Sequence, residues 1–428
     1  MNVELRYGEE TRALALPADV AVQYVAPREM NGVDHPGEEL RRACGAPLDS
    51  PPLAERAPRE GRVTIAVADL TRGGGTETLL PLLVAELEGL GVERSRVTVL
   101  IARGTHRRLD AEEKRFFKSR LLRGVDIVEH DCDDAESLSA LLLTRRGSPV
   151  RVNRLVREAA LTVLLSPVSF HYFAGFGGGR KLVLPGCADR QSIVANHRLS
   201  LVGERPARLH PSCRSGNTAG NPVHEDMCET LAALGGRVFA VNFFADAAGR
   251  LLFVNAGDPL VAHTRACEAY ARVFRVPVER AASVVVLSAG GAPYDVNLVQ
   301  AHKALRHGAR TASEGATILF YARCSEGVGS SSLESALSAE RKAFLDGAWK
   351  NYELNNQTAV SLLGLTARHR VGMVTELDEA WLRRAGMEPV NNPEAFVAAS
   401  LETHRADRVA VVRQGAVTLP EGPDKEEG

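Results

Sequence analysis

The stretch RVTIAVADLTRGGGTETLLPLLVAELEGLGVERSRVTVLIARGTHRR, residues 62–108, decides the fold class. Residues 62–68 and 97–101 are short runs rich in β-branched and aliphatic side chains, which predict two buried strands. Residues 77–90 lie between them and predict a helix that ends at Gly91. A strand, a helix and a second strand in this order predict parallel pairing, because the helix carries the chain back to the edge where it started.

The same alternation extends along the chain. Residues 110–122 predict a helix capped by Asp110, with Glu113 three residues later. Further strands are expected at 125–128, 161–165, 282–287, 317–321, 370–374 and 408–412. We therefore predict an α/β protein of two domains with mainly parallel sheets and an active site in the cleft between them.

The domain boundaries follow from where the alternation starts and restarts. An N-terminal domain is expected over residues 1–280 and a C-terminal α/β domain over 281–404, with a tail, about 405–428, that packs back on the first domain. Residues 1–60 are expected to form an irregular lead-in, and residues 187–275 are expected to be helical and loop sequence.

Composition excludes several classes of partner. The chain has 428 residues, of which 45% are hydrophobic and 25% charged, as is usual for globular proteins. Lys and Arg number 52 and Asp and Glu 53, and aromatic residues are only 5%, so neither nucleic acid nor a membrane is an expected partner. The seven cysteines include no CxxC pair, which argues against a disulfide framework or a structural zinc site and favours a reduced, cytoplasmic protein.

Polar residues follow the first two strands at one sheet edge. Asp69-Leu70-Thr71-Arg72 precedes three glycines that open a helix, so backbone N–H groups there can approach an anion and Arg72 can grip a carboxylate or phosphate. An ordinary turn with a surface arginine is the alternative. His106 follows the second strand and would project at the same edge. A single histidine is more often a surface or core residue, but the shared edge favours a function.

The richest segment is residues 169–186, which has five glycines between 175 and 186 together with His171 and Lys181. It is not a Walker A loop, because Leu182 follows the lysine, and it is not a dinucleotide fingerprint. Lys181 could bind phosphate, form a Schiff base or carry an acyl group. A surface loop is the alternative, but the segment's large aromatic residues argue for burial.

Two further positions can complete a site. His197 lies 16 residues after Lys181 and could return to the same pocket as a metal ligand, with the other ligands supplied by a cofactor. Gln300 and Lys303 are three residues apart and share a helical face, which suits an anionic, hydroxylated ligand but also an ordinary solvated face. The polar cluster at 220–225 is expected to cap a helix.

These motifs occur together in one known family. DLTR at 69–72, GTHR at 104–107, HYFAGFGGGRK at 171–181, NH at 196–197 and QAHK at 300–303 stand in the family's order. The chain resembles the nickel-pincer-nucleotide-dependent lactate racemase family, which also includes racemases and epimerases of other 2-hydroxy acids. The resemblance implies reversible hydride transfer from the substrate α carbon, through a 2-keto acid.

The resemblance also implies roles for individual residues. Lys181 matches the lysine that tethers the cofactor, pyridinium-3-thioamide-5-thiocarboxylic acid mononucleotide, and His197 matches the protein ligand of its nickel. His106 and His171 match the paired acid–base histidines, and Arg72 matches a substrate-binding residue. Gln300 and Lys303 match substrate-facing residues of the second domain. The positions implied to hold the cofactor and its phosphate are Asp69, Thr71, Gly74, Gly75, Gly178 and Gly179.

Two departures from the family pattern bear on the substrate. Val299 stands where the lactate enzymes have an aromatic residue before the glutamine, and Gly73-Gly74 stand where a proline is common. Both changes could admit a larger or more polar acid than lactate, such as a sugar acid. The implied partners are this small acid and, transiently, the proteins that make the cofactor, whereas the sequence does not indicate an oligomeric state.

Two other classes of protein remain as alternatives. A non-catalytic relative that binds the cofactor or a sugar acid would lack acid–base or tether residues, yet all of these positions are present. An amidohydrolase or a phosphoryl-transfer enzyme would show clustered metal ligands or a true P-loop, and the sequence has neither.

Overall fold

The computed structural model describes residues 1–68, 74–119, 122–203 and 205–422. The predicted positions Asp69, Thr71 and Arg72, and residues 423–428 of the expected tail, lie outside the described residues. The longer strands of the described chain are β1 (Asn2–Tyr7), β2 (Glu10–Ala15), β3 (Ala21–Tyr24), β4 (Val63–Val67), β5 (Val97–Ile101), β6 (Asp126–Glu129), β7 (Leu138–Leu143), β8 (Pro149–Asn153), β9 (Leu161–Pro167), β14 (Val238–Ala245), β15 (Leu251–Gly257), β17 (Ala282–Ser288), β18 (Ala312–Tyr321), β19 (Arg370–Val374) and β21 (Arg408–Val412). The short strands are β10 (Phe170–His171), β11 (Gly175–Phe176), β12 (Leu201–Val202), β13 (Arg208–Leu209), β16 (Arg275–Pro277), β20 (Glu388–Pro389) and β22 (Leu419–Glu421). The helices are α1 (Pro36–Gly45), α2 (Leu53–Arg56), α3 (Thr76–Gly89), α4 (Ala111–Phe117), α5 (Arg154–Arg157), α6 (Arg190–Arg198), α7 (Pro222–Ala232), α8 (Val261–Phe274), α9 (Leu298–Gly308), α10 (Ser331–Ser338), α11 (Arg341–Gly347), α12 (Asn356–Arg368), α13 (Glu379–Arg384) and α14 (Pro393–His404).

The first sheet has the order β15-β14-β9-β4-β5-β6, and all its pairs are parallel except β14 with β15. Every residue of β4 and β5 is buried, which explains their continuous apolar sequence, because helices cover both faces of these strands. Asp110 caps α4 in a capping box with Glu113, as the sequence predicts. The α/β class with mainly parallel sheets is confirmed.

The second sheet has the order β20-β19-β18-β17-β21-β3, and all its pairs are parallel. Its strands β17, β18, β19 and β21 fall at the predicted places. Apolar side chains of these strands and of the helices around them, among them α9 and α12, form a separate core from that of the first sheet.

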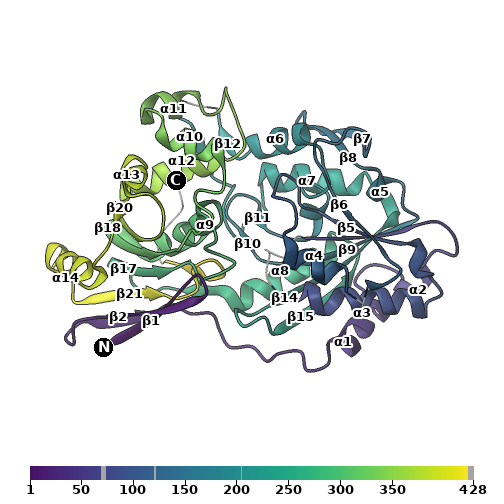
Figure 1. Cartoon of the computed structure of the whole chain (residues 1–428), viewed down its shortest axis with the longest axis horizontal. Coiled ribbons are helices and arrows are strands. Elements are labelled where there is room, and N and C mark those ends of the chain that lie inside the picture. Colours follow the sequence, from purple (N-terminus) through teal and green to yellow (C-terminus); the bar gives the residue numbers. More distant parts are fainter. Residues whose placement is uncertain (69–73, 120–121, 204, 423–428) are drawn as a thin grey trace.

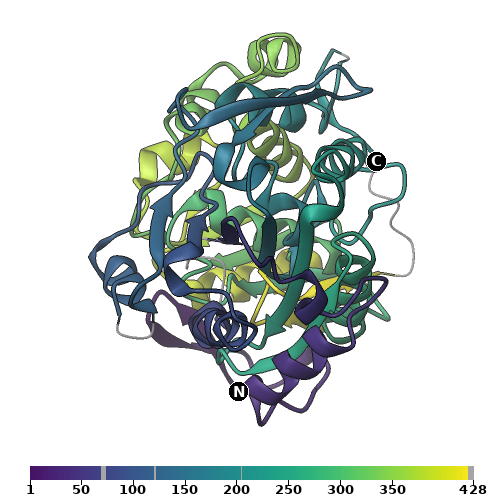
Figure 2. The same cartoon turned by 90° about the vertical axis from the view of Figure 1, so that its right-hand side faces the viewer.

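Sheet membership differs from the expected division of the chain. Strand β3 pairs with β21 in the second sheet, and the β1–β2 hairpin buries Leu5 and Leu14 against Val286 and Leu319 of that sheet. The first 25 residues therefore belong with the C-terminal domain, and a single cut at residue 280 does not separate the domains. Figure 1 shows the purple segment after β3 crossing from the second domain to α1 of the first domain. Figure 2 shows the purple helices that follow this segment at the lower edge of the first domain.

The tail expected to pack back on the first domain divides between the two. Strand β21 completes the second sheet, whereas β22 pairs with β16, which directly follows α8. Strands β14 and β15 of the first sheet lie within residues 187–275, which were expected to be helical and loop sequence, and the β7–β8 hairpin lies in a region for which no element was predicted.

The two domains meet along the glycine-rich segment. The Tyr172 side chain is buried, its hydroxyl lies 2.7 Å from the Thr358 hydroxyl, and its ring lies 4.4 Å from that of His302. The Ser215 hydroxyl lies 2.8 Å from Nε2 of His307. Residues on either side of the sequence boundary are thus joined by buried polar and aromatic contacts. None of the described helices has the length and apolarity to cross a bilayer, and all seven cysteines are free thiols.

Buried histidines make the stability of the fold dependent on pH. Burial, together with the charge of Lys303, lowers the pKa of His302 to about 3, although the hydrogen bond with the Val299 carbonyl acts in the opposite direction. Between the two pKa values, His302 binds a proton in the unfolded chain but not in the folded protein. The folding stability that depends on neutral His302 is therefore fully present above the pKa of the unfolded state, and it falls as the pH drops below that pKa. We expect His302 to remove about 2 kcal/mol of stability between pH 7 and pH 5.

Denaturant unfolding at pH 5, 6 and 7 measures this effect. The His302→Gln variant should lose less stability over this range than the native protein, whereas His35→Gln, at an exposed histidine, should follow the native protein. Parallel pH profiles of the native and His302→Gln proteins would contradict the prediction.

Candidate active site

The glycine-rich segment is built by close backbone packing on the end of β9. Gly178 and Gly179 have φ angles of +75° and +53°. A Cβ on Gly178 would lie 2.6 Å from the Pro167 carbonyl oxygen, and one on Gly179 would lie 2.5 Å from the His263 ring. Both positions therefore require glycine for packing within the protein. Whether they also hold a cofactor stays a prediction.

A chain of buried polar groups anchors the same segment. The Gly179 backbone N–H donates to Oγ of Ser166 (2.8 Å), whose hydroxyl donates to Oδ1 of Asn242 (3.0 Å). Asn242 in turn donates to Asn255 (3.2 Å), which donates to the Ala262 carbonyl (2.8 Å). Each buried polar group in this chain has a partner, so the chain fixes the start of the turn that carries Lys181.

Arg180 connects this turn to the hairpin that carries His171. Its side chain is fully buried, and Nη2 donates to the carbonyls of Ala174 (2.8 Å) and Phe176 (3.1 Å). Burial lowers the pKa of this guanidinium, and among the described residues no carboxylate pairs with it. Through Nη2 the arginine therefore ties the hairpin backbone to the lysine turn, while its Nη1 lies 3.3 Å from Nε2 of His263.

Three of the predicted site residues surround the Phe173 ring. The ring centroid lies 4.5 Å from that of His171, 4.9 Å from that of His197 and 5.4 Å from Nζ of Lys181. The histidine rings both meet Phe173 edge to face. An ammonium near an aromatic face is favourable, so the ring keeps the lysine amine close to both imidazoles.

The orientation of His197 leaves one ring nitrogen available to a ligand. Its Nδ1 lies 3.3 Å from Oδ1 of Asn196, whose own amide donates to Asp226 (2.9 Å) and to the Val223 carbonyl (3.2 Å). Because these bonds turn the Asn196 oxygen toward the histidine, the proton belongs on Nδ1. Within the described residues, Nε2 makes no hydrogen bond, as a metal-binding imidazole requires.

Burial, and then the charges of Lys181 and His106, lower the pKa of His197 well below its ordinary value. The imidazole is therefore neutral at pH 7, the form that binds metals. Lys181 lies beside His197 across the Phe173 ring, and the charge of His106 in its protonated form also acts on His197. The donor set of one neutral imidazole beside a lysine amine fits a nickel ion whose remaining ligands come from a lysine-linked cofactor.

The loop that carries His106 is attached to the end of the glycine-rich segment. The Gly104 N–H donates to the Gly186 carbonyl (2.9 Å), and Gly104 has a φ of +53°. The His106 N–H donates to the Arg103 carbonyl (2.9 Å), which closes a turn directly after β5. The GTHR motif therefore follows β5 at the carboxyl end of that strand, as expected, whereas the DLTR motif lies outside the described residues, so the expected shared edge stays a prediction.

The second domain contributes a bonded pair. Lys303 donates to Oε1 of Gln300 (2.6 Å) on the first turns of α9, so the predicted shared helical face is confirmed. Helix α9 adjoins the site through the contact of His302 with Tyr172, whose ring stacks on that of His171.

Gly74 and Gly75 lie at the start of α3. A Cβ on Gly75, whose φ is +118°, would lie 2.7 Å from the Phe243 ring. A Cβ on Gly74 would lie 3.2 Å from the Cα atom of Gly249.

The predicted cap at 220–225 is confirmed, because Asn221 caps α7.

Sequence reasoning missed the residues that support the site. Ser166, Asn242 and Arg180 hold the glycine-rich segment, and Phe173 packs between its functional groups. A visible signal for Asn242 was a single amide within the apolar run VFAVNFFA, because a buried polar residue in a strand must find partners.

The described chain is a two-domain α/β protein with mainly parallel sheets, in which a glycine-rich lysine turn and two histidines meet at the Phe173 ring. The sequence matches the family models for the lactate racemase N-terminal domain over residues 7–208 and the lactate racemase C-terminal domain over residues 278–419. Lactate racemase from Thermoanaerobacterium thermosaccharolyticum is 30% identical over 332 residues, covering 77% of this chain and 76% of that protein. Lactate racemase from Lactiplantibacillus plantarum is 28% identical over 387 residues, covering 88% of this chain and 89% of the relative.

Solved structures agree with this relationship. The apoprotein of the Thermoanaerobacterium thermosaccharolyticum lactate racemase superposes with a TM-score of 0.87 at 25% identity, covering 98% of this chain and all of the other. A protein from Thermotoga maritima matches with a TM-score of 0.67 at 17% identity, covering 90% of this chain and 97% of the other, which shows a shared fold. The chain belongs to the lactate racemase family, a family of isomerases.

Proposed function

We propose that the protein racemises or epimerises a 2-hydroxy acid by removing hydride from the α carbon and returning it to the opposite face of a 2-keto acid. The observation that carries the proposal is the convergence of His171, His197 and the Lys181 amine on the Phe173 ring. Family membership supports the reaction class.

Lys181 would hold a nickel-pincer nucleotide through a thioamide, and His197 would ligate the nickel through Nε2. When bound, this group supplies an electrophilic hydride acceptor. Such chemistry avoids deprotonating the α carbon, which is a poor carbon acid beside a carboxylate.

The protein's own side chains would manage the substrate's charge and proton. One histidine of the pair His106 and His171 takes the hydroxyl proton of one enantiomer, and the other serves the opposite enantiomer. The cations of Arg72 and Lys303 hold the carboxylate while the keto group turns. Gln300 accepts a hydrogen bond from Lys303 and thereby keeps that ammonium in place.

We propose a substrate that is larger or more polar than lactate, such as a sugar acid. Val299 replaces an aromatic residue directly before Gln300, and its side chain packs partly buried against the core of the second domain rather than filling space as a large ring would. The two named relatives are lactate racemases, so lactate is the reference substrate.

A panel of enantiopure 2-hydroxy acids tests both parts of the proposal. The protein is produced together with the cofactor-biosynthesis proteins, incubated with lactate, larger aliphatic acids and sugar acids, and the products are separated by chiral chromatography. We expect inversion of at least one larger or polar acid at a rate that matches or exceeds that of lactate. Fast turnover of lactate alone would reject the larger substrate, and no inversion by nickel-loaded protein would reject the function.

A further inference from the structure

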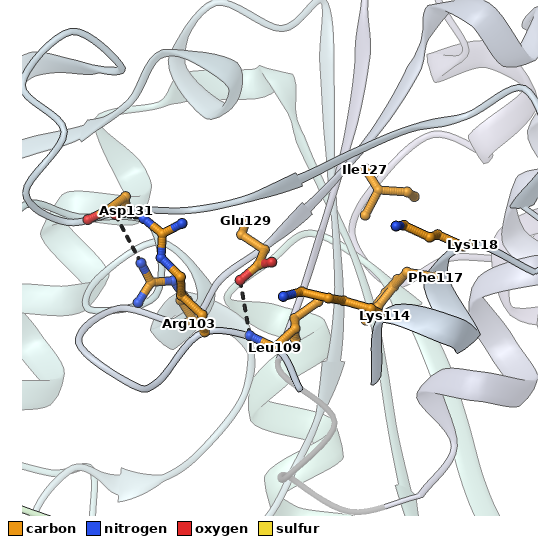
Figure 3. Close-up of a pocket in the computed structure, with 9 residues that line it drawn as sticks. Arg103, Leu109, Lys114, Phe117, Lys118, Ile127, Glu129 and Asp131 are labelled. Atoms are coloured by element: carbon orange, nitrogen blue, oxygen red, sulfur yellow. Dashed lines mark hydrogen bonds and ion pairs between the residues drawn. The ribbon is translucent and has the colours of Figure 1, made fainter. Parts of the chain in front are cut away.

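A pocket lies between α4 and β6, and Phe173 is not among the residues that line it. Its volume is about 330 Å³, within the range of small-molecule sites. The residues that line it are Arg103, Arg108, Leu109, Lys114, Phe117, Lys118, Ile127, Glu129 and Asp131. Figure 3 shows Lys114 and Lys118 extending from the helix side toward the side formed by Ile127 and Glu129.

The charges of this pocket do not balance. Four cationic side chains face two carboxylates, and both carboxylates already have partners. Asp131 is bound by Arg103 (3.2 Å) and Arg108 (3.0 Å), and Glu129 accepts the Leu109 N–H (3.0 Å).

The two lysines are the uncompensated charges. Within the part of the chain that the structure describes, neither Lys114 nor Lys118 has a carboxylate within 4.0 Å. They stand four residues apart at the end of α4, where like charges repel each other. A dianion between them would relieve the repulsion.

Arg103 provides a buried guanidinium with one N–H group that has no hydrogen-bond partner among the described residues. Its side chain is 9% exposed, and its Nε is buried without a hydrogen-bond partner among the described residues. Nη1 of the same guanidinium donates to the His106 carbonyl (2.6 Å). The pocket therefore shares one arginine with the loop that carries His106.

We propose that this pocket binds a small organic dianion, with its phosphate or paired carboxylates between Lys114 and Lys118 and its apolar body against Leu109, Phe117 and Ile127. The bound anion engages Arg103 and thereby stabilises the turn at His106. Only this second, regulatory step rests on the proposed function, because binding itself needs no racemase activity.

Isothermal titration at low salt with phenyl phosphate, phthalate, inorganic phosphate and phenol tests the binding. We expect one aromatic dianion to bind more tightly than inorganic phosphate and phenol, and the better of the two identifies phosphate or dicarboxylate as the preferred head group. The Lys114→Gln/Lys118→Gln variant should bind that ligand at least about tenfold more weakly, because it loses two charge-assisted contacts.

The Lys342→Gln/Lys350→Gln variant is the matched control, since it removes the same net charge from exposed positions of the second domain. It should bind as the native protein does. If the control variant lost as much affinity for the ligand, the effect would come from long-range charge, and the proposed site would be wrong. Absence of binding by both aromatic dianions would also overturn the site, as would binding of the better one no tighter than that of inorganic phosphate.

Hydrogen exchange tests the link to His106 without using activity. The His106 amide bonds to the Arg103 carbonyl, so ligand binding should slow its exchange severalfold in the native protein. The Arg103→Lys variant keeps the positive charge but lacks the guanidinium that bonds to the His106 carbonyl. The ligand should still bind to this variant, but it should no longer slow exchange of the His106 amide. Unchanged exchange in the ligand-saturated native protein would overturn the link and leave the proposed racemase untouched.

Discussion

A Lys181→Ala variant is expected to lose the covalent cofactor adduct and all racemase activity while keeping its fold. The amine is the group that the proposed thioamide requires, and its side chain is partly exposed, so removing it costs the fold little. The contact with Phe173 is worth about 0.5–1 kcal/mol. Intact-protein mass and nickel content measure attachment, and thermal unfolding measures the fold.

Lys181→Arg is the matched control for charge. It retains a cation near Phe173 but cannot form the same thioamide, so it should also lack the adduct. Both variants are produced beside native protein in a host that makes the cofactor. Full activity of Lys181→Ala would show that the lysine does not tether the cofactor.

His106→Ala and His171→Ala should each retain the adduct and lose racemisation, with a fall in kcat of about 10²–10⁴-fold or more. Each histidine serves as base for one enantiomer and as acid for the other, so either substitution should slow both directions equally. The measurement is initial rate from each pure enantiomer, together with adduct mass.

His35→Ala, at an exposed histidine of the first domain, is the control and should leave both rates unchanged. Paired acid–base roles would be contradicted if a variant of His106 or His171 kept the native kcat. They would also be contradicted if the initial rate fell for one pure enantiomer and not for the other. Loss of the adduct itself would indicate that the histidine supports cofactor attachment.

The central strands and their helices could be predicted because local sequence and tertiary environment agree there. Strand β4 is apolar throughout since it is covered on both faces, and α4 begins at a capping box. The residues of the glycine-rich segment were identified by composition, because glycines beside buried aromatic residues have few structural uses other than a close backbone approach.

What sequence reasoning missed depends on pairings between distant residues. Strand β3 stands near the N-terminus yet pairs with β21, almost four hundred residues later, and no local pattern specifies that partner. Strand β14 pairs with β9 across more than 70 residues. Likewise, the support that Ser166 and Asn242 give to Gly179 exists only once both strands are in place.

The fate of the α hydrogen tests the central claim most directly. Native, cofactor-loaded protein is incubated in ordinary water with one enantiomer of its 2-hydroxy acid carrying deuterium at C2, and the inverted product is analysed by mass spectrometry. Reversible hydride removal predicts that the inverted product retains the deuterium. Inverted product that carries a solvent proton at C2 would show removal of the α hydrogen as a proton and contradict the account.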